Sequence, residues 1–197
     1  MQGKYGVNQD HYCYEGSVVL INLLNIRDSD ELTQAEAEFT LMRYSEYCSD
    51  LDELEDFDSN HFLSLHRVLF QDIYEWAGTI RDVDISKANT RFCTCSRVEP
   101  ELNKAISRIP LIRFCSNKHE LVVLVADIFS DLNVVHPFRE GNGRTTRFFF
   151  EELLHVAGYR IEWPLITKEE WVDANIHGYF GQMHKLEVIF DAAIIEP

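Results

Sequence analysis

Long apolar runs are missing from this sequence of 197 residues. No stretch approaches the roughly 20 apolar residues that a membrane-spanning helix needs, so contact with a membrane is not expected. The residues after Met1 contain no apolar core of a secretory signal, which favours a cytoplasmic protein. The 5 cysteines cannot all pair within one chain, and without such a signal they are expected to be reduced thiols.

Positive charge is also scarce, because 18 Lys and Arg stand against 33 Asp and Glu, a formal net charge of -15. Such an acidic chain is a poor direct partner for a nucleic-acid backbone. A nucleotide site needs only local positive charge, so the acidity does not exclude one. Internal repeats and low-complexity segments are absent from the sequence, and 46% hydrophobic residues predict a folded chain with one well-buried core.

One polar segment, residues 136–147, lies between two apolar segments with helical spacing. It has the sequence His-Pro-Phe-Arg-Glu-Gly-Asn-Gly-Arg-Thr-Thr-Arg. Apolar residues recur at helical intervals up to Val135, and Pro137 disfavours helical dihedrals at the residue before it. A second apolar run ends at Gly158, a suitable glycine C-cap. The pattern predicts helix, polar loop, helix, and we call residues 136–147 the motif loop.

The residue types of the motif loop suit a bound polyphosphate. Gly141 and Gly143 carry no side chains, so backbone N–H groups at the start of a helix can approach an anion closely. Arg144 and Arg147 are three positions apart and project from neighbouring faces of the first helical turns. Two guanidinium groups beside an amide-lined loop favour a polyphosphate over a single carboxylate.

Two further residues of the motif loop add chemistry to that site. Glu140 is the one acid in the positive cluster, and a carboxylate beside phosphates is a typical Mg²⁺ ligand. His136 is expected to titrate near neutrality and to serve as a general base. Together these residues predict nucleotide–Mg²⁺ binding with a base near a phosphate.

The motif loop resembles the signature of the Fic family, His-x-Phe-x-(Asp/Glu)-Gly-Asn-Gly-Arg-x-x-Arg, and matches every constrained position. Residues 74–85 also resemble the family segment that leads into its target-docking flap. The resemblance covers most of residues 5–190 and is closest to the bacterial toxin branch. It implies a mostly α fold: a single Fic domain, residues 28–197, with a small β-hairpin flap over the active site, preceded by an N-terminal docking segment, residues 1–27.

The region from residue 80 to 96, which we call the flap, has a modest hairpin pattern. Apolar and polar residues alternate around Val83 and Ile85, a turn-like stretch follows, and residues 92–95 can return. The resemblance implies that the flap clamps a target segment by main-chain pairing, a form of strand addition. The flap residues expected at the target are Asp84, Ile85, Ser86, Lys87 and Phe92. A plain structural hairpin is the alternative.

The activity that the resemblance implies is protein adenylyltransfer (AMPylation), in which AMP passes from ATP to a hydroxyl side chain of a target protein. The phosphates would lie along Gly141, Asn142 and Gly143, with Arg147 as the γ-phosphate ligand. Two alternatives stay open: a Fic-type transferase of UMP, phosphocholine or phosphate, and a partner-binding protein with a vestigial site. The intact Gly-Asn-Gly sequence favours AMP.

The resemblance also implies regulation by a partner. Fic enzymes are commonly inhibited by a helix with the pattern (Ser/Thr)-x-x-x-Glu-(Gly/Asn), whose Glu pairs with the second motif arginine. Glu precedes Gly or Asn only at Glu15 and Glu140, and the residues four positions earlier are His11 and His136. We therefore expect inhibition by a separate small antitoxin that captures Arg147. Toxin-branch relatives imply type II topoisomerase subunits, such as DNA gyrase, as the target.

Other segments carry local helix signals. Asp28 and Thr167 each precede a Glu at capping-box spacing. An apolar stripe that starts after Ser59 or Asn60 predicts a long helix ending at Gly78. His61 and His66 are five apart and do not share a helical face, so they are not expected to form a metal-ligand pair. Candidates for the adenine pocket are Asn175 and Tyr179, with packing within a helix as the alternative.

Overall fold

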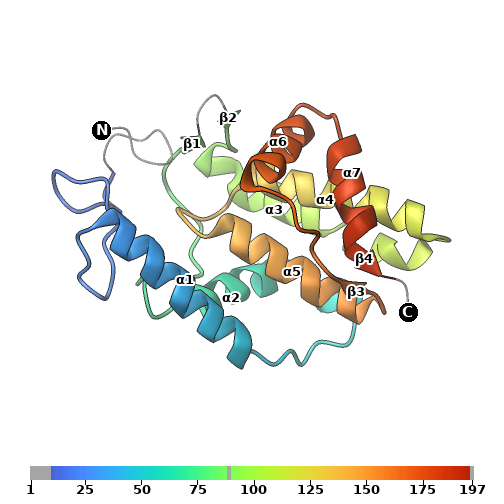
Figure 1. Ribbon diagram of the computed structural model, residues 1–197, viewed down its shortest axis with the longest axis horizontal. Coiled ribbons are helices and arrows are strands. Elements are labelled where there is room, and N and C mark those ends of the chain that lie inside the picture. The colour runs from blue at the N-terminus through green and yellow to red at the C-terminus, as the bar shows by residue number, and fades with distance from the viewer. Residues whose placement is uncertain (1–9, 88–89, 196–197) are drawn as a thin grey trace.

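Two buried helices, α4 (Lys118–Val135) and α5 (Asn142–Val156), form the centre of the fold. The computed structural model describes residues 10–87 and 90–195. Figure 1 shows α5 between α2 and α4, and both of these helices contact it. Helices α3, α6 and α7 pack against α4. The loop between α4 and α5 is therefore held at both ends by the core.

The described residues are mostly helical, as predicted, with seven α-helices and strands that pair only as short two-stranded sheets. The other α-helices are α1 (Ser29–Glu46), α2 (Ser59–Phe70), α3 (Val98–Ile106), α6 (Lys168–Tyr179) and α7 (His184–Ala193). Three 3-10 helices are η1 (Leu54–Asp56), η2 (Cys95–Arg97) and η3 (Ile109–Phe114). In both sheets the strands are antiparallel: β1 (Ser86–Lys87) with β2 (Thr90–Arg91), and β3 (Arg160–Ile161) with β4 (Ile194–Ile195).

Local signals place several helix ends correctly. The Asp28 carboxylate caps α1 by accepting hydrogen bonds from the backbone N–H groups of Asp30 and Glu31. Thr167 and Glu170 form both halves of a capping box at α6. Helix α4 ends at Val135, two residues before Pro137, as the sequence predicts.

The helix expected to be capped by Ser59 or Asn60 and to end at Gly78 is wrong at both ends. Helix α2 stops at Phe70, and its N-cap is Asp58, whose carboxylate accepts a hydrogen bond from His61 N at 2.8 Å. The apolar stripe continues past the helix because Ile73 is buried in the core by tertiary packing. Gly78 then adopts a φ of 81°, a left-handed conformation that glycine accepts without steric cost.

Residues 10–27 pack on the same core as the helices. Tyr12, Val19 and Leu20 are buried in it. Leu23 N donates a hydrogen bond to Ile73 O at 2.8 Å, which ties this segment to the chain that follows α2. Residues 1–9 of the expected docking segment lie outside the described residues. Over residues 10–87 and 90–195, no helix combines the length and the apolar character needed to cross a bilayer.

The predicted hairpin is present in the flap. Ser86 pairs with Arg91 and Lys87 with Thr90 in antiparallel register. Ile85 and Phe92 form a small buried cluster beside the main core. The hairpin is therefore attached to the molecule by apolar contacts at its base.

Candidate active site

The motif loop has two left-handed residues and one buried anchor. His136 ends α4 with a φ of 46°, and Gly141 precedes α5 with a φ of 84°. Between them Phe138 is fully buried and stacks on His66 at a centroid distance of 3.7 Å, so its ring anchors the loop in the core. The Asn142 side chain closes the loop, because its Oδ1 accepts from Phe138 N and its Nδ2 donates to Phe138 O, both at 2.8 Å.

Among the described residues, no side chain caps the backbone amides at the start of α5. Asn142 and Gly143 occupy the first turn, where N–H groups have no carbonyl partner within the helix. A side chain at position 143 would meet no heavy atom within 4 Å, so the space beside Gly143 is open. The first turn of α5 can therefore receive phosphate oxygens at close range.

His136 is a neutral imidazole in this site. Nδ1 lies 3.0 Å from Asn133 O; because a carbonyl only accepts, Nδ1 carries the proton and Nε2 the basic lone pair. The ring stacks on Phe92 of the flap at 3.8 Å and 11°. Burial lowers the pKa of His136 to about 3, against smaller raising effects from the Asn133 carbonyl and Glu140. The expectation that His136 titrates near neutrality is wrong, because burial outweighs its anionic neighbour.

The two motif arginines have different environments. Arg144 Nη2 lies 2.5 Å from Glu36 Oε2 on α1 and 3.8 Å from Glu140 Oε1. Arg147 lies over the Trp171 ring at 5.8 Å, and burial lowers its pKa. Both arginines line a cavity of about 230 Å³, completed by Thr40, Leu41, Tyr44, Leu69, Phe148 and Glu151.

Glu36 contacts a motif arginine, although no sequence pattern singles it out. Its carboxylate is buried and accepts a second hydrogen bond from the Tyr74 hydroxyl. This pair orients the carboxylate toward Arg144, so part of the Arg144 charge is already compensated within the protein. No motif or spacing marks Glu36, because it occupies an ordinary position in α1.

Glu140 is held by its own loop and by His66. Its Oε1 accepts from Gly141 N at 3.0 Å. His66 Nε2 donates to the Glu140 carbonyl at 3.0 Å, and His66 Nδ1 accepts from Gly78 N at 2.8 Å. Burial lowers the pKa of His66 to about 3, so this histidine is a neutral support for the loop. His61 has a different partner, since its Nε2 lies 2.5 Å from Glu152 Oε2.

The flap residues divide between its support and its outer edge. The two oxygens of Asp84 accept hydrogen bonds from Cys95 N at 2.7 Å and Arg91 Nη2 at 3.2 Å. Tyr179 of α6 donates from its hydroxyl to Arg91 O at 3.0 Å, so this adenine-pocket candidate contacts the flap. The other candidate, Asn175, donates to Trp171 O within α6, which agrees with a packing role.

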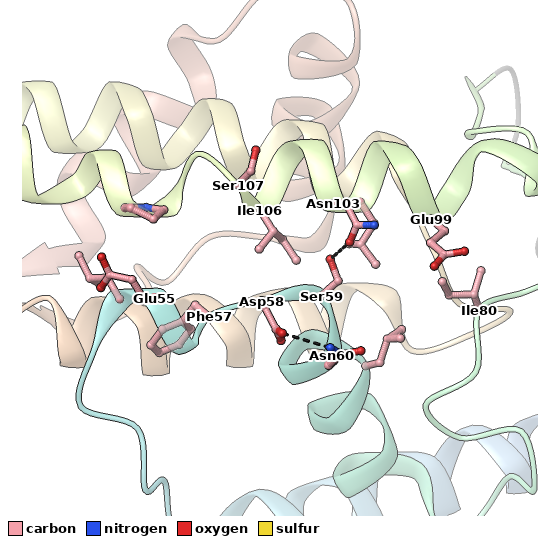
Figure 2. Close-up of a pocket in the computed structure, with 14 residues that line it drawn as sticks. Glu55, Phe57, Asp58, Ser59, Asn60, Ile80, Glu99, Asn103, Ile106 and Ser107 are labelled. Atoms are coloured by element: carbon pink, nitrogen blue, oxygen red, sulfur yellow. Dashed lines mark hydrogen bonds between the residues drawn. The ribbon is translucent and has the colours of Figure 1, made fainter.

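A second cavity, of about 430 Å³, lies between the start of α2 and α3. Figure 2 shows Ser59 and Asn103 facing each other across it, joined by a hydrogen bond of 2.5 Å. None of its lining residues belongs to the motif loop. The motif-loop residues, with their glycines and arginines, therefore lie outside this cavity.

Known proteins are similar to this chain over almost its whole length. "Probable protein adenylyltransferase Fic" of Escherichia coli (strain K12) is 36% identical over 198 residues, which cover 100% of this chain and 98% of the relative. "Protein adenylyltransferase VbhT" of Bartonella schoenbuchensis is 33% identical over 98% of this chain, which spans 41% of that relative.

Solved structures agree as well. The N-terminal Fic domain of a VirB-translocated Bep effector protein from Bartonella quintana, solved with bound ADP, superposes with a TM-score of 0.83 at 27% identity. The match covers 94% of this chain and 94% of that one. The model of the Fic/DOC family matches residues 56–154. Because the motif loop, the fold and the similarity to a relative over its whole length all agree, the chain belongs to the Fic/DOC family.

Proposed function

We propose that this chain is a protein adenylyltransferase, which transfers AMP from ATP to a hydroxyl side chain of a target protein. The observation that carries the proposal is the arrangement of His136 beside the first turn of α5. Nδ1 of His136 is fixed by Asn133 O, so Nε2 is the basic nitrogen, and five residues of the motif loop join His136 to the start of α5 at Asn142. Relatives named protein adenylyltransferases, similar over the whole chain, support the same reaction.

In the proposed mechanism the ATP phosphates lie along Gly141, Asn142 and Gly143, and Arg144 and Arg147 neutralise the outer phosphates. The target hydroxyl oxygen attacks the α-phosphorus, and the bond from that phosphorus to the bridging oxygen of the leaving pyrophosphate breaks. His136 Nε2 accepts the hydroxyl proton. The protein supplies positioning and charge neutralisation, which dominate catalysis of phosphoryl and nucleotidyl transfer.

We propose Mg²⁺ as the cofactor, held by Glu140. Among the described residues, no group of three or more His, Cys, Asp and Glu side chains is arranged to hold a metal ion. A single carboxylate nevertheless fits Mg²⁺, which in nucleotide sites keeps several waters and takes its other oxygens from phosphates. Bound there, the ion would neutralise phosphate charge, while Glu140 is kept at the loop by Gly141 N.

Replacing the Glu140 carboxylate by an amide is expected to abolish the Mg²⁺ dependence of turnover. Glu140→Gln keeps the side-chain shape and an oxygen near Gly141 N but loses the charge that holds the ion. We expect kcat/KM to fall by about 10²-fold at saturating Mg²⁺, the loss typical of a removed charge-stabilising group. The measurement is a Mg²⁺ titration of AMP transfer, with Glu38→Gln on the exposed face of α1 as the control. An unchanged Mg²⁺ dependence in Glu140→Gln would contradict the metal role.

We propose that the flap docks an extended segment of the target by strand addition. Supporting features are the two-stranded hairpin at Ser86–Lys87 and the stacking of Phe92 on His136, which brings the hairpin next to the base. Asp84 and Ile85 hold the base of the hairpin, while Ser86 and Lys87 form its first strand. The family resemblance points to type II topoisomerase subunits such as DNA gyrase as the target.

We propose further that a separate antitoxin controls this enzyme by supplying a glutamate to Arg147. The support is the absence of the inhibitory pattern from the sequence and the cavity of about 230 Å³ that Arg147 lines beside α1. The test is co-expression with the small reading frame next to this gene. Failure to form a complex, together with full activity in its presence, would reject the idea.

We also propose a cytoplasmic location, where ATP is available, and a division into a docking segment, residues 1–27, and a catalytic domain, residues 28–197.

The function itself is tested with ATP labelled at the α-phosphate. The purified chain, Mg²⁺ and a bacterial lysate should give a labelled protein band, and a variant without the His136 imidazole should give none. The mass of the labelled protein would identify the target. Absence of the band with ATP, but its presence with labelled UTP or another phosphate donor, would replace AMP by that group. No transfer from any donor would reject the enzyme assignment.

A further inference from the structure

The largest side chain buried almost completely in the described core belongs to Arg81, which is 1% exposed. It follows α2 and precedes the hairpin of the flap. Among residues 10–87 and 90–195, no carboxylate forms an ion pair with its guanidinium group. A buried cation without an anionic partner is costly unless its N–H groups are all well used. Burial accordingly lowers the pKa of Arg81, although arginine stays protonated at neutral pH.

The Arg81 guanidinium binds backbone carbonyls on two different segments. On the catalytic side, Nε donates to His136 O at 2.8 Å and Nη2 to Val135 O at 3.2 Å. On the flap side, Nη1 donates to Val83 O at 2.6 Å and Nη2 to Cys93 O at 2.5 Å. One planar side chain therefore joins the end of α4 to both arms of the flap.

Backbone hydrogen bonds also join the flap to the segment around the end of α4, residues 134–137, and we call this contact the seam. Arg81 N donates to Pro137 O at 2.9 Å, and Cys93 N donates to Val134 O at 3.0 Å. The residue next to Cys93 is Phe92, whose ring stacks on His136. The seam therefore sets two relations together: the left-handed backbone of His136 and the position of the flap against its ring.

We propose that Arg81 is a positioning residue for AMP transfer, which holds the flap and the catalytic histidine in one fixed relation. The inference rests on the proposed function. A target strand docked on the flap would present its hydroxyl to His136 Nε2 only if these two segments keep their separation. Because in-line attack depends on such geometry, a misplacement of about 1 Å can reduce the rate by about 10²-fold. Arg81 itself does not need to touch ATP or the target.

The proposal predicts a loss of kcat without a loss of ATP binding in Arg81→Lys. Lysine keeps the charge, but its donors share one nitrogen and cannot reach carbonyls on both segments. We expect kcat for AMP transfer to fall by about 10²-fold, with the dissociation constant for a non-hydrolysable ATP analogue changed by less than about threefold. Arg81→Met, which lacks every donor, should lose more.

The matched control is Arg108→Lys. Arg108 also bonds to α4, through Asp127 and Asp131, which lie about two turns and one turn before Val135, and these bonds involve neither the motif loop nor the flap. This substitution should leave kcat within about threefold of the parent protein. An equal loss of kcat in the Arg108 and Arg81 variants would show that Arg81 only stabilises α4, and it would overturn the proposal.

A second measurement does not depend on activity, and its first part uses only the unsubstituted protein. In the unsubstituted protein, the Arg81 Nε–H and the Cys93 amide should exchange with solvent at least about 10²-fold more slowly than the side chain of the exposed Arg160. In Arg81→Lys, Cys93 should lose that protection, and the His136 ring should lose its ring-current shift from Phe92. Fast exchange at Arg81 in the unsubstituted protein would overturn the proposal even if AMP transfer is confirmed. Slow exchange in a protein without AMP transfer would reject only the proposed function.

Discussion

His136→Asn is expected to abolish AMP transfer while the protein stays folded and binds ATP. Asparagine tolerates the left-handed conformation found at φ 46°, so the end of α4 is kept. The variant loses the imidazole that we propose as the acceptor of the target hydroxyl proton. Removal of a general base lowers kcat by about 10²–10⁴-fold, and little change is expected in ATP affinity because phosphate binding depends on α5. The measurements are single-turnover transfer from labelled ATP and calorimetric binding of an ATP analogue.

The pH profile checks the protonation state of the same residue. Burial lowers the pKa of His136 to about 3, so the imidazole is neutral over the whole range in which the enzyme is assayed. A neutral base needs no deprotonation, so kcat/KM should not fall as the pH drops through the ordinary histidine range near 6.5. A decline in kcat/KM with an apparent pKa near 6.5 in the parent protein would contradict the buried, neutral state of His136.

Gly141→Ala is expected to destabilise the fold as well as to inactivate the enzyme. A Cβ at this position would lie 2.4 Å from two ring atoms of Phe70 and 3.2 Å from His66 Nε2. Phe70 is fully buried, so its ring has no room to move aside. The left-handed φ of 84° adds strain of about 1–2 kcal/mol for alanine, and overpacking adds about 1–3 kcal/mol. Together they remove a large part of a typical stability of about 5–15 kcal/mol.

Gly143→Ala is the control that separates the two effects. This glycine has an ordinary φ and no heavy atom within 4 Å of the added Cβ, so the variant should melt close to the parent protein. The added methyl group instead occupies the open space where phosphates would approach α5, and ATP affinity should fall. Thermal melting and nucleotide titration of both variants separate the loss of stability from the loss of ATP affinity. Equal melting temperatures for Gly141→Ala and the parent would show that the Phe70 contact is not a constraint.

The sequence alone determined those parts of the protein that depend on neighbouring residues. Pro137 ends α4, Thr167 and Glu170 cap α6, and the alternation around Ile85 predicts the hairpin, because each signal acts within a few positions of the backbone. The motif loop also specifies its chemistry locally, since glycines, arginines and a carboxylate stand side by side. A helix expected to continue to Gly78 was the main local error, because apolar periodicity does not distinguish a helix from a buried turn.

Only the tertiary structure decided which distant groups support that loop. Glu36 reaches Arg144 across 108 positions, His66 reaches the Glu140 carbonyl across 74, and Arg81 reaches the His136 carbonyl across 55. No local pattern encodes these pairs, because they depend on how α1, α2 and the flap pack around α4 and α5. The protonation state of His136 belongs to the same class: its residue type suggests titration near neutrality, and burial by distant segments lowers the pKa to about 3.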